Sequence, residues 1–221
     1  MALCLGDKNV IDARDHMHRN WLCYEKSEDD PENTLAQIQW MVGTLHGRQL
    51  WDIGCGPCRA TRFFGPAAYN GFDAEKAWQE VIPDGASFHP WSIAQCAAYL
   101  PQNSCDVVLC NEVLYHSLFW CEDFHDLWRM TRNMLIVTVY YAPGRIPFLT
   151  RHKGARVVLV GDRADASQWQ ATQNIVPQWM VKRFIEKKLR PRPASVRYHW
   201  QRVPGWNGFG IGYAVIQKGG E

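Results

Sequence analysis

The sequence has little net charge and no long apolar stretch. Its 24 Lys and Arg nearly balance its 22 Asp and Glu, and the formal charge of +2 at pH 7 does not favour nucleic acid as a partner. No run of about 18 apolar residues predicts a membrane span. The first apolar stretch contains Asp7 and Lys8, unlike a signal peptide. We therefore expect a cytoplasmic protein that does not associate with a membrane.

Internal repeats, low-complexity tracts and linkers are also missing, so we expect a single domain over residues 1–221. The eight cysteines are scattered, and several, such as Cys110, lie inside apolar segments. This distribution is typical of reduced thiols and does not indicate a disulfide framework. The chain contains 47% hydrophobic and 21% charged residues, the composition of a folded globular protein.

Short apolar runs alternate with helical patterns through the first two thirds of the chain. The predicted strands are 49–53, 69–72, 87–89, 106–109 and 135–141, and three predicted helices are 59–64, 75–81 and 118–132. A further predicted helix precedes the first strand, with Asp30 as its N-cap and Gly47 as its stop. Short strands of this kind, separated by helices, predict an α/β fold with a mostly parallel central sheet and helices on both faces.

The last third of the chain has a different pattern. Residues 168–189 predict one or two helices, interrupted at Pro177. Residues 196–203 and 209–216 are extended runs joined by a segment rich in Pro and Gly. These two runs predict a C-terminal antiparallel hairpin.

A glycine-rich turn follows the first predicted strand. Asp52 lies at the end of that strand, and Gly54 and Gly56 let the backbone bend sharply and approach a ligand closely. A turn of this kind is common to several nucleotide-binding α/β folds. A dinucleotide-binding turn would need a further glycine at position 59, where this chain has Arg59.

The same turn contains a Cys-Gly-Pro-Cys tetrapeptide, Cys55 to Cys58, like the active site of thioredoxins. Those proteins have Trp directly before the first Cys, where this chain has Gly54. A thiol redox protein is therefore an alternative interpretation that the surrounding sequence favours less. One Cys-x-x-Cys without a second pair of ligands does not predict a metal site.

A second acidic residue, Asp73, closes the next predicted strand, 21 residues after Asp52. A carboxylate at this place can accept hydrogen bonds from both hydroxyls of a ribose. Asp is also a common helix N-cap, which is the alternative for the helical segment that starts at Glu75.

Residues 45–140 resemble the class I methyltransferases that use S-adenosylmethionine (SAM). Residues 51–58 resemble their first motif, with Cys58 in place of its last glycine, and residues 106–116 resemble the fourth motif of small-molecule methyltransferases. The resemblance implies SAM as the cofactor. It also implies three parts of the domain, namely a helical cap over 1–47, a cofactor-binding half over 48–141, and a substrate-side insert with the terminal hairpin over 142–221.

The resemblance implies roles for individual residues. Ser92 and Ile93 take the place beside the adenine where the family often has an acidic residue followed by a hydrophobic one, and Asn111 would lie beside the cofactor. The full set of implied cofactor-binding residues is Asp52, Gly54, Cys55, Gly56, Asp73, Ala74, Ser92, Ile93, Asn111 and Glu112.

Tyr115 and His116 would lie near the methyl acceptor. A general base is needed only if the acceptor must lose a proton, and His116 is the leading candidate because an imidazole titrates near neutrality. Its alternative role is to anchor the loop by hydrogen bonding. We expect a small-molecule acceptor methylated at oxygen or nitrogen, with nucleic acid or protein as the alternative acceptor. The fourth motif lacks the Asn/Asp-Pro-Pro-aromatic tetrapeptide of enzymes that methylate nucleobase amino groups.

Overall fold

A computed structural model describes the chain over residues 34–117, 120–142, 150–152, 155–160, 171–202 and 210–219. The described strands form one sheet with the order β3-β2-β1-β4-β5-β8-β7-β6, and β10 pairs with both β5 and β9. The parallel core of the sheet consists of β1 (Gln49–Ile53), β2 (Ala68–Phe72), β3 (Ser87–His89), β4 (Cys105–Cys110) and β5 (Thr131–Ala142). These five strands confirm the predicted mostly parallel sheet.

The chain reverses its direction of travel across the sheet at β1. It moves outward from β1 to β2 and β3, returns to place β4 on the other side of β1, and then continues to β5. In such a sheet, ligands bind outside the carboxyl ends of the strands where the order reverses. The turn after β1 and the loop after β4 meet at this point.

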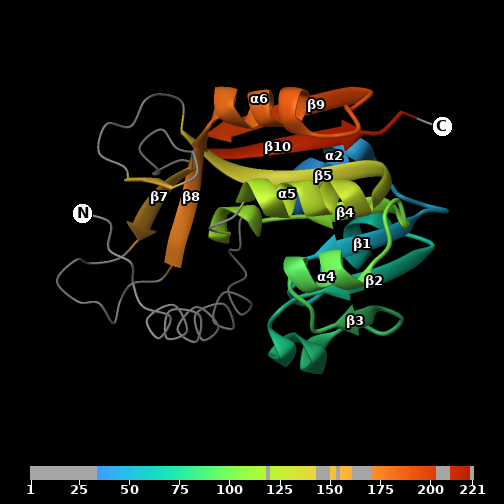
Figure 1. Cartoon of the computed structure of the whole chain (residues 1–221). Helices are drawn as coiled ribbons and strands as arrows, with labels where there is room; N and C mark the ends of the chain where they lie inside the picture. Colours follow the sequence, from blue (N-terminus) through green and yellow to red (C-terminus); the bar gives the residue numbers. More distant parts are fainter. Residues whose placement is uncertain are drawn as a thin grey trace.

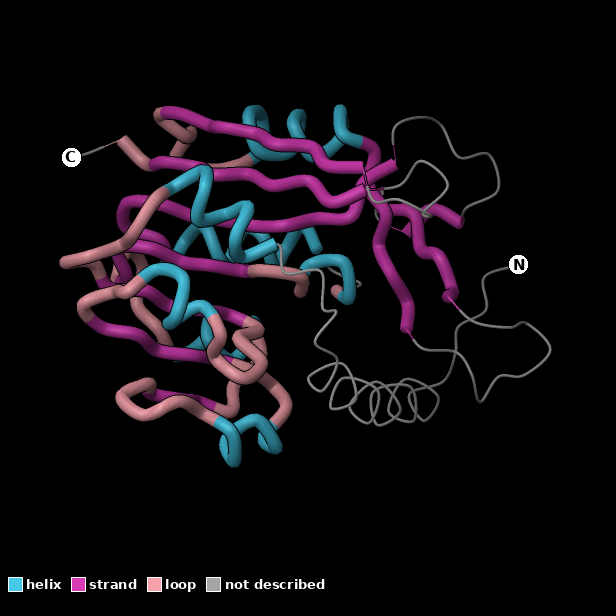
Figure 2. Tube along the Cα trace, turned by 180° about the vertical axis from the view of Figure 1, so that it is seen from behind, coloured by secondary structure: helices cyan, strands magenta, loops and turns pink. Residues whose placement is uncertain are grey.

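Helices cover both faces of the sheet, as the sequence predicts (Figures 1 and 2). One face carries α4 (Ile93–Tyr99), α5 (Trp120–Met130) and α6 (Gln178–Lys188), whose buried residues share one apolar core with the sheet. The other face carries α2 (Thr34–Val42) and α3 (Ala60–Phe64), which pack into a second core. Two short 3-10 helices, η1 (Lys76–Val81) and η2 (Leu114–His116), follow the carboxyl ends of β2 and β4.

Three strands extend the sheet beyond its parallel core, namely β6 (Thr150–His152), β7 (Ala155–Val160) and β8 (Ala171–Pro177). β10 pairs with one edge of β5 along residues 134–141 of β5. β4 pairs with β5 as far as residue 137, and β8 pairs with it from residue 140. Because a strand has two edges, β8 continues along the edge that β4 leaves. It therefore packs against η2 beside the carboxyl ends of the parallel strands (Figure 1).

The C-terminal hairpin is confirmed. β9 (Ser195–Arg202) and β10 (Gly210–Gln217) pair antiparallel over their whole lengths. The predicted connection between them, residues 204–208, lies outside the described residues. β10 also pairs antiparallel with β5, so the hairpin is part of the main sheet.

Two predictions of local structure are wrong, and one helix is missing from the prediction. The first half of the helical prediction over 168–189 fails, because 171–177 is strand β8 and only 178–188 is helical. The predicted helix 118–132 ends at Met130, since Thr131 and Arg132 already belong to β5. Helix α4 was not predicted, although Ser92 and Gln95 form the capping box that marks its start.

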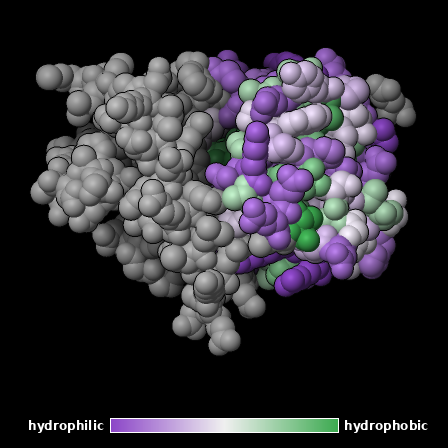
Figure 3. Space-filling view, turned by 90° about the horizontal axis from the view of Figure 1, so that it is seen from below, coloured by the Kyte–Doolittle hydropathy of each residue, from purple (hydrophilic) through white to green (hydrophobic). Residues whose placement is uncertain are grey.

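The described helices are short. None of those in the described part of the chain is long and apolar enough to cross a membrane. Seen from below, the described surface is mostly hydrophilic, with small separate hydrophobic areas among polar residues (Figure 3).

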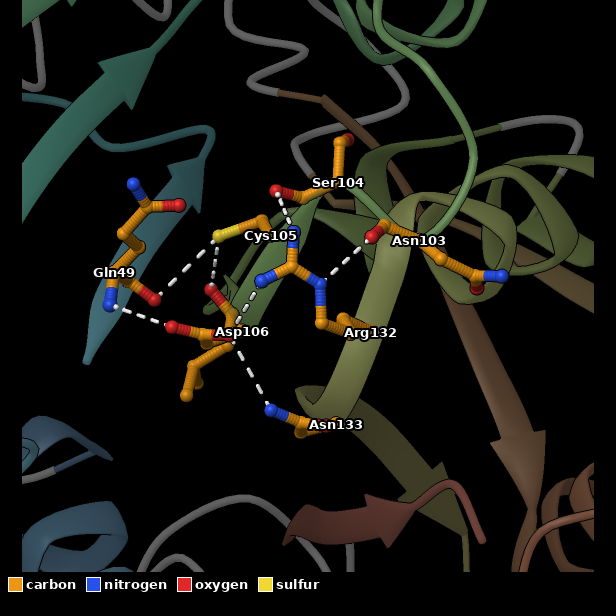
Figure 4. A network of polar contacts seen from close by, with 8 residues as sticks. Gln49, Asn103, Ser104, Cys105, Asp106, Arg132 and Asn133 are labelled. Carbon is orange, nitrogen blue, oxygen red and sulfur yellow. Dashed lines mark hydrogen bonds and ion pairs between the residues drawn. The ribbon is translucent and has the colours of Figure 1, made fainter. Parts of the chain in front are cut away.

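A polar network joins three parallel strands at their amino ends, opposite the switch point (Figure 4). The Asp106 carboxylate accepts from the Gln49 backbone N–H at 3.2 Å, from Arg132 Nη1 at 3.0 Å and from Asn133 Nδ2 at 3.3 Å. Arg132 in turn donates to the carbonyl oxygens of Asn103 and Ser104. One carboxylate thus connects β1, β4 and β5.

We expect Asp106→Ala to lower the free energy of unfolding by about 1–2 kcal/mol, because three donors lose their acceptor at once. Urea denaturation measures this change. Asp126→Asn is the matched control, since it removes an isolated surface pair with Arg129 at 4.0 Å, which should cost no more than about 0.5 kcal/mol. Equal effects of the two variants would contradict the role of the network.

Candidate functional site

The turn after β1 has an unusual backbone. Gly54, Gly56 and Cys58 all have positive φ, at 76°, 49° and 59°. The backbone N–H groups of Gly54 and Cys55 both donate to the Phe72 carbonyl oxygen, at 2.6 and 3.1 Å. The turn is thereby held against the carboxyl end of β2.

The missing side chain of Gly54 makes room for another part of the protein. A Cβ at this position would lie 2.1 Å from Val113 Cγ2, so a larger residue would push the loop after β4 away. At Gly56 the nearest atom to such a Cβ is in Trp78, at 4.0 Å. Gly54 therefore serves packing between the two loops, and Gly56 leaves the backbone open.

Asp73 ties the turn to the segment after β2. Its Oδ2 accepts from the Gly56 backbone N–H at 3.0 Å, and its Oδ1 accepts from the Glu75 backbone N–H at 2.9 Å. Burial raises the pKa of Asp73, while these two hydrogen bonds oppose the rise. The alternative role as N-cap falls to Glu75, whose side chain caps η1. Ala74 lies in the bend between the two acids.

Asp52 is buried and faces the core beneath α2 and α3. Its Oδ2 accepts from the Tyr69 hydroxyl at 2.7 Å. Burial raises the pKa of Asp52 to about 7, with a further rise from the charge of Asp73, and the Tyr69 hydrogen bond opposes both. The hydrogen bond thus ties the end of β1, from which the turn starts, to β2.

Cys55 and Cys58 lie in the same buried layer. Their sulfur atoms are 3.6 Å apart and share a hydrogen bond. Gly71 of β2 makes space for them, since a Cβ there would be 2.7 Å from both sulfur atoms.

Ser92 and Ile93 begin α4. The Ser92 Oγ accepts from the Gln95 backbone N–H at 3.3 Å, and the Gln95 Oε1 accepts from the Ser92 N–H at 2.9 Å. Ser92 is therefore a helix N-cap, and its predicted contact with an adenine stays a prediction. Phe72, His89 and Trp91 form an aromatic cluster beside it, in which the Phe72 and His89 rings stack at 4.8 Å.

The loop after β4 is held by Thr138 of β5. The Thr138 Oγ1 accepts from the Glu112 backbone N–H at 2.6 Å and donates to Asn111 Oδ1 at 3.2 Å. Asn111 Nδ2 donates to Thr34 Oγ1 of α2 at 2.9 Å. Glu112 has a positive φ of 58°, and this hydroxyl bond stabilises that backbone conformation.

The predicted acceptor side begins at η2. The Tyr115 ring is buried and stacks on Tyr140 of β5, with ring centroids 3.8 Å apart and planes 7° apart. The backbone of His116 ends η2, and its side chain lies outside the described residues. A small apolar cavity between η2, α5, β5 and β8 is lined by Leu114, Tyr115, Trp120, Val139 and Val176.

The structure brings the predicted cofactor residues to the carboxyl ends of β1, β2, β3 and β4. Sequence reasoning missed Tyr69 and Thr138, which hold Asp52 and the loop after β4. The signal for Thr138 was a single threonine among the apolar and aromatic residues of the run 134–141. Within the described residues, no group of three or more His, Cys, Asp or Glu could hold a metal ion.

The chain matches no protein-family model and no curated protein by sequence. Its fold is similar to magnesium protoporphyrin IX methyltransferase from Synechocystis PCC 6803 with bound SAM, at a TM-score of 0.61 and 16% identity over 99% of this chain and 100% of that chain. The N-terminal domain of EvdMO1, crystallised with S-adenosylhomocysteine (SAH) and D-fucose, gives a TM-score of 0.61 at 12% identity, over 96% of this chain and 99% of that one. The cyclase SpnF gives 0.55 at 12%, over 83% and 80%. The chain thus has the fold of class I SAM-dependent methyltransferases.

Asp52 should make stability depend on pH. Its folded pKa of about 7 exceeds the value of about 4 in an unfolded chain. The folded protein therefore keeps a proton that the unfolded chain releases, and the resulting stability is complete below about pH 4 and is lost as the pH rises through 7. Between pH 5 and pH 8, wild type should lose on the order of 1–3 kcal/mol more unfolding free energy than Asp52→Asn. Urea denaturation at both pH values measures the unfolding free energies, and Glu80→Gln, at an exposed position, is the control. An equal change in unfolding free energy between pH 5 and pH 8 for Asp52→Asn and wild type would contradict the raised pKa of Asp52.

Thr138→Val should destabilise the loop after β4, because an isosteric methyl leaves the Glu112 N–H without its hydroxyl acceptor. We expect a loss of about 1–3 kcal/mol in unfolding free energy. Thr138→Ser keeps the hydroxyl and should lose clearly less. The hydrogen-bonding role fails if chemical denaturation gives the serine variant the same loss as the valine variant.

Proposed function

We propose that this protein is a SAM-dependent methyltransferase that transfers a methyl group to oxygen or nitrogen of a small molecule. The observation that carries the proposal is the hydrogen bond between the Gly56 N–H and the Asp73 carboxylate. It joins a glycine turn and a half-buried acid at the switch point of a parallel sheet, where nucleoside ligands bind in such folds.

The residues at the switch point fit SAM chemically. An ionised carboxylate has about four acceptor positions, and Asp73 uses two of them for Gly56 and Glu75. The remaining positions can accept the two ribose hydroxyls. The backbone of Gly54 to Gly56 would face the methionine part, together with Asn111 and Glu112, and Ala74, Ser92 and Ile93 would border the adenosine part. Asp52 and Cys55 would support the turn from below.

SAM supplies an activated methyl group on sulfur, and the protein's task is to align an acceptor atom with it. The proposed acceptor site lies at η2, beside β8. Tyr115 and Tyr140 would form one wall of this site, and His116 would accept a proton where the acceptor is a hydroxyl. The scattered cysteines, several of them inside apolar segments, fit a reducing compartment, and we propose the cytoplasm.

A small-molecule acceptor fits two further observations. The related proteins named above include one for magnesium protoporphyrin IX and one crystallised with D-fucose. The net charge of +2 offers no general attraction to nucleic acid. The cyclase SpnF shares the fold, so cofactor binding and methyl transfer need separate measurements.

Calorimetric titration tests the first step. We expect SAM and SAH to bind with dissociation constants in the micromolar range. Asp73→Ala should weaken SAM binding by roughly 10- to 100-fold, because hydrogen bonds to a charged group contribute about 1.5–3 kcal/mol. Asp84→Asn, an exposed acid after η1, is the matched control and should bind like wild type.

Absence of SAM and SAH binding by the folded wild-type protein would overturn the proposed function. Binding that Asp73→Ala leaves unchanged would remove Asp73 from the ribose site. The acceptor follows from incubating the protein with SAM labelled in its methyl group and a panel of small hydroxyl and amine compounds. Nucleic acid and protein serve in parallel as acceptors for the alternative class.

A further inference from the structure

We propose that Cys55 and Cys58 form a reversible disulfide that weakens SAM binding, with a low-molecular-weight disulfide as the oxidant. The proposal rests on the proposed function for its effect on SAM. The bond itself depends only on the geometry of the two thiols.

The backbone already holds the two cysteines at bridging distance. The Cys58 N–H donates to the Cys55 carbonyl oxygen at 3.0 Å, which closes a turn over four residues. The Cα atoms at the ends of such a turn are less than about 7 Å apart, and disulfides span about 4.4–6.8 Å. The sulfur atoms, now 3.6 Å apart, need to approach by about 1.5 Å to reach bonding distance.

The surroundings favour this pair over other partners. The two thiols face the backbone of β2 at Gly71, where a side chain would collide with both sulfur atoms. Cys58 is fully buried and Cys55 is 8% exposed, so a small oxidant reaches Cys55 when the turn opens. The hydrogen bond between the two thiols lowers the pKa of Cys58, while this bond and burial raise the pKa of Cys55. Opening of the turn removes both effects on Cys55, so its thiolate forms in the open state, where the oxidant reaches it.

The disulfide forms in two thiol–disulfide exchange steps. The Cys55 thiolate attacks one sulfur of the oxidant, forms a mixed disulfide and expels one thiolate. The Cys58 thiolate then attacks the Cys55 sulfur and expels the second thiolate. Two electrons pass to the oxidant, and the two protons from the cysteines end on the two released thiols. A dithiol reductant reverses both steps.

The bridge would act on the cofactor site through Gly56. This residue lies between the two cysteines, and its N–H holds the Asp73 carboxylate. Drawing the sulfur atoms together shifts the turn and, with it, the carboxylate that is proposed to bind the ribose. Because coupling between two equilibria is reciprocal, SAM should also oppose formation of the disulfide by the same factor.

The test treats the whole protein with oxidised glutathione, with and without later dithiothreitol. Trypsin cleaves after Arg48 and Arg59 and releases the peptide 49–59, which contains Cys55, Cys58 and no other cysteine. We expect this peptide to lose two hydrogens on oxidation and to regain them on reduction. SAM affinity, measured by calorimetry, should fall by roughly 5- to 150-fold and recover with dithiothreitol.

Two variants serve as controls. Cys55→Ser removes the thiol that the oxidant reaches and leaves only the fully buried Cys58, so treatment with oxidised glutathione should not change the SAM affinity of this variant relative to the untreated variant. Cys105→Ser removes an equally buried thiol at the opposite end of the sheet, and it should respond like wild type.

A peptide 49–59 that stays reduced, or a bridged protein that binds SAM as tightly as the reduced one, overturns the inference. Neither result affects the proposed function. Failure of the reduced protein to bind SAM overturns the proposed function and the coupling together, and peptide mass still reports the bond separately.

Discussion

The parallel pairing of β1 with both β2 and β4 is the constraint on which the rest of the site depends. The register sets Asp52 beside Gly71 on one side and beside Leu109 on the other. All three strands therefore end at the same level, and the chain segments that leave them are forced into contact. Gly54 against Val113, and Gly56 against Asp73, are the contacts that result. Without this register, the glycine turn would have no acid and no second loop beside it.

The same pairing explains why the layer beneath the turn is chemically unusual. Closely spaced strands bury Asp52, Tyr69, Cys55 and Cys58 together, where a charge is costly. Burial raises the pKa of Asp52 to about 7, and the hydrogen bond from Tyr69 opposes this rise. Within this layer Asp52 is thus the group whose charge changes near neutral pH, while burial raises the pKa values of Tyr69 and Cys55 and keeps them neutral. A structural layer of this kind links the stability of the turn to its chemical surroundings.

Local pattern was enough to predict much of the cofactor half. The strands 49–53 and 87–89 were predicted with the bounds that the structure shows, because their limits are set by turns within a few residues. The helix predicted over 171–177 failed because its apolar spacing is overruled by long-range pairing with β5 and β7. Thr138 holds a loop that lies 26 residues before it in sequence, and no local signal connects the two.

The same difference separates two parts of the site. The glycine turn and Asp73 depend on local sequence, whereas the wall at η2 depends on long-range strand pairing. The turn and Asp73 follow from short segments, and the same fold occurs in methyltransferases and in a cyclase. The wall at η2 depends on β8, which reaches β5 only because β4 ends and leaves an edge free. Since β8 packs on η2 and Val176 and Tyr115 line one cavity, a change in this late strand would reshape the proposed acceptor side and leave the glycine turn intact.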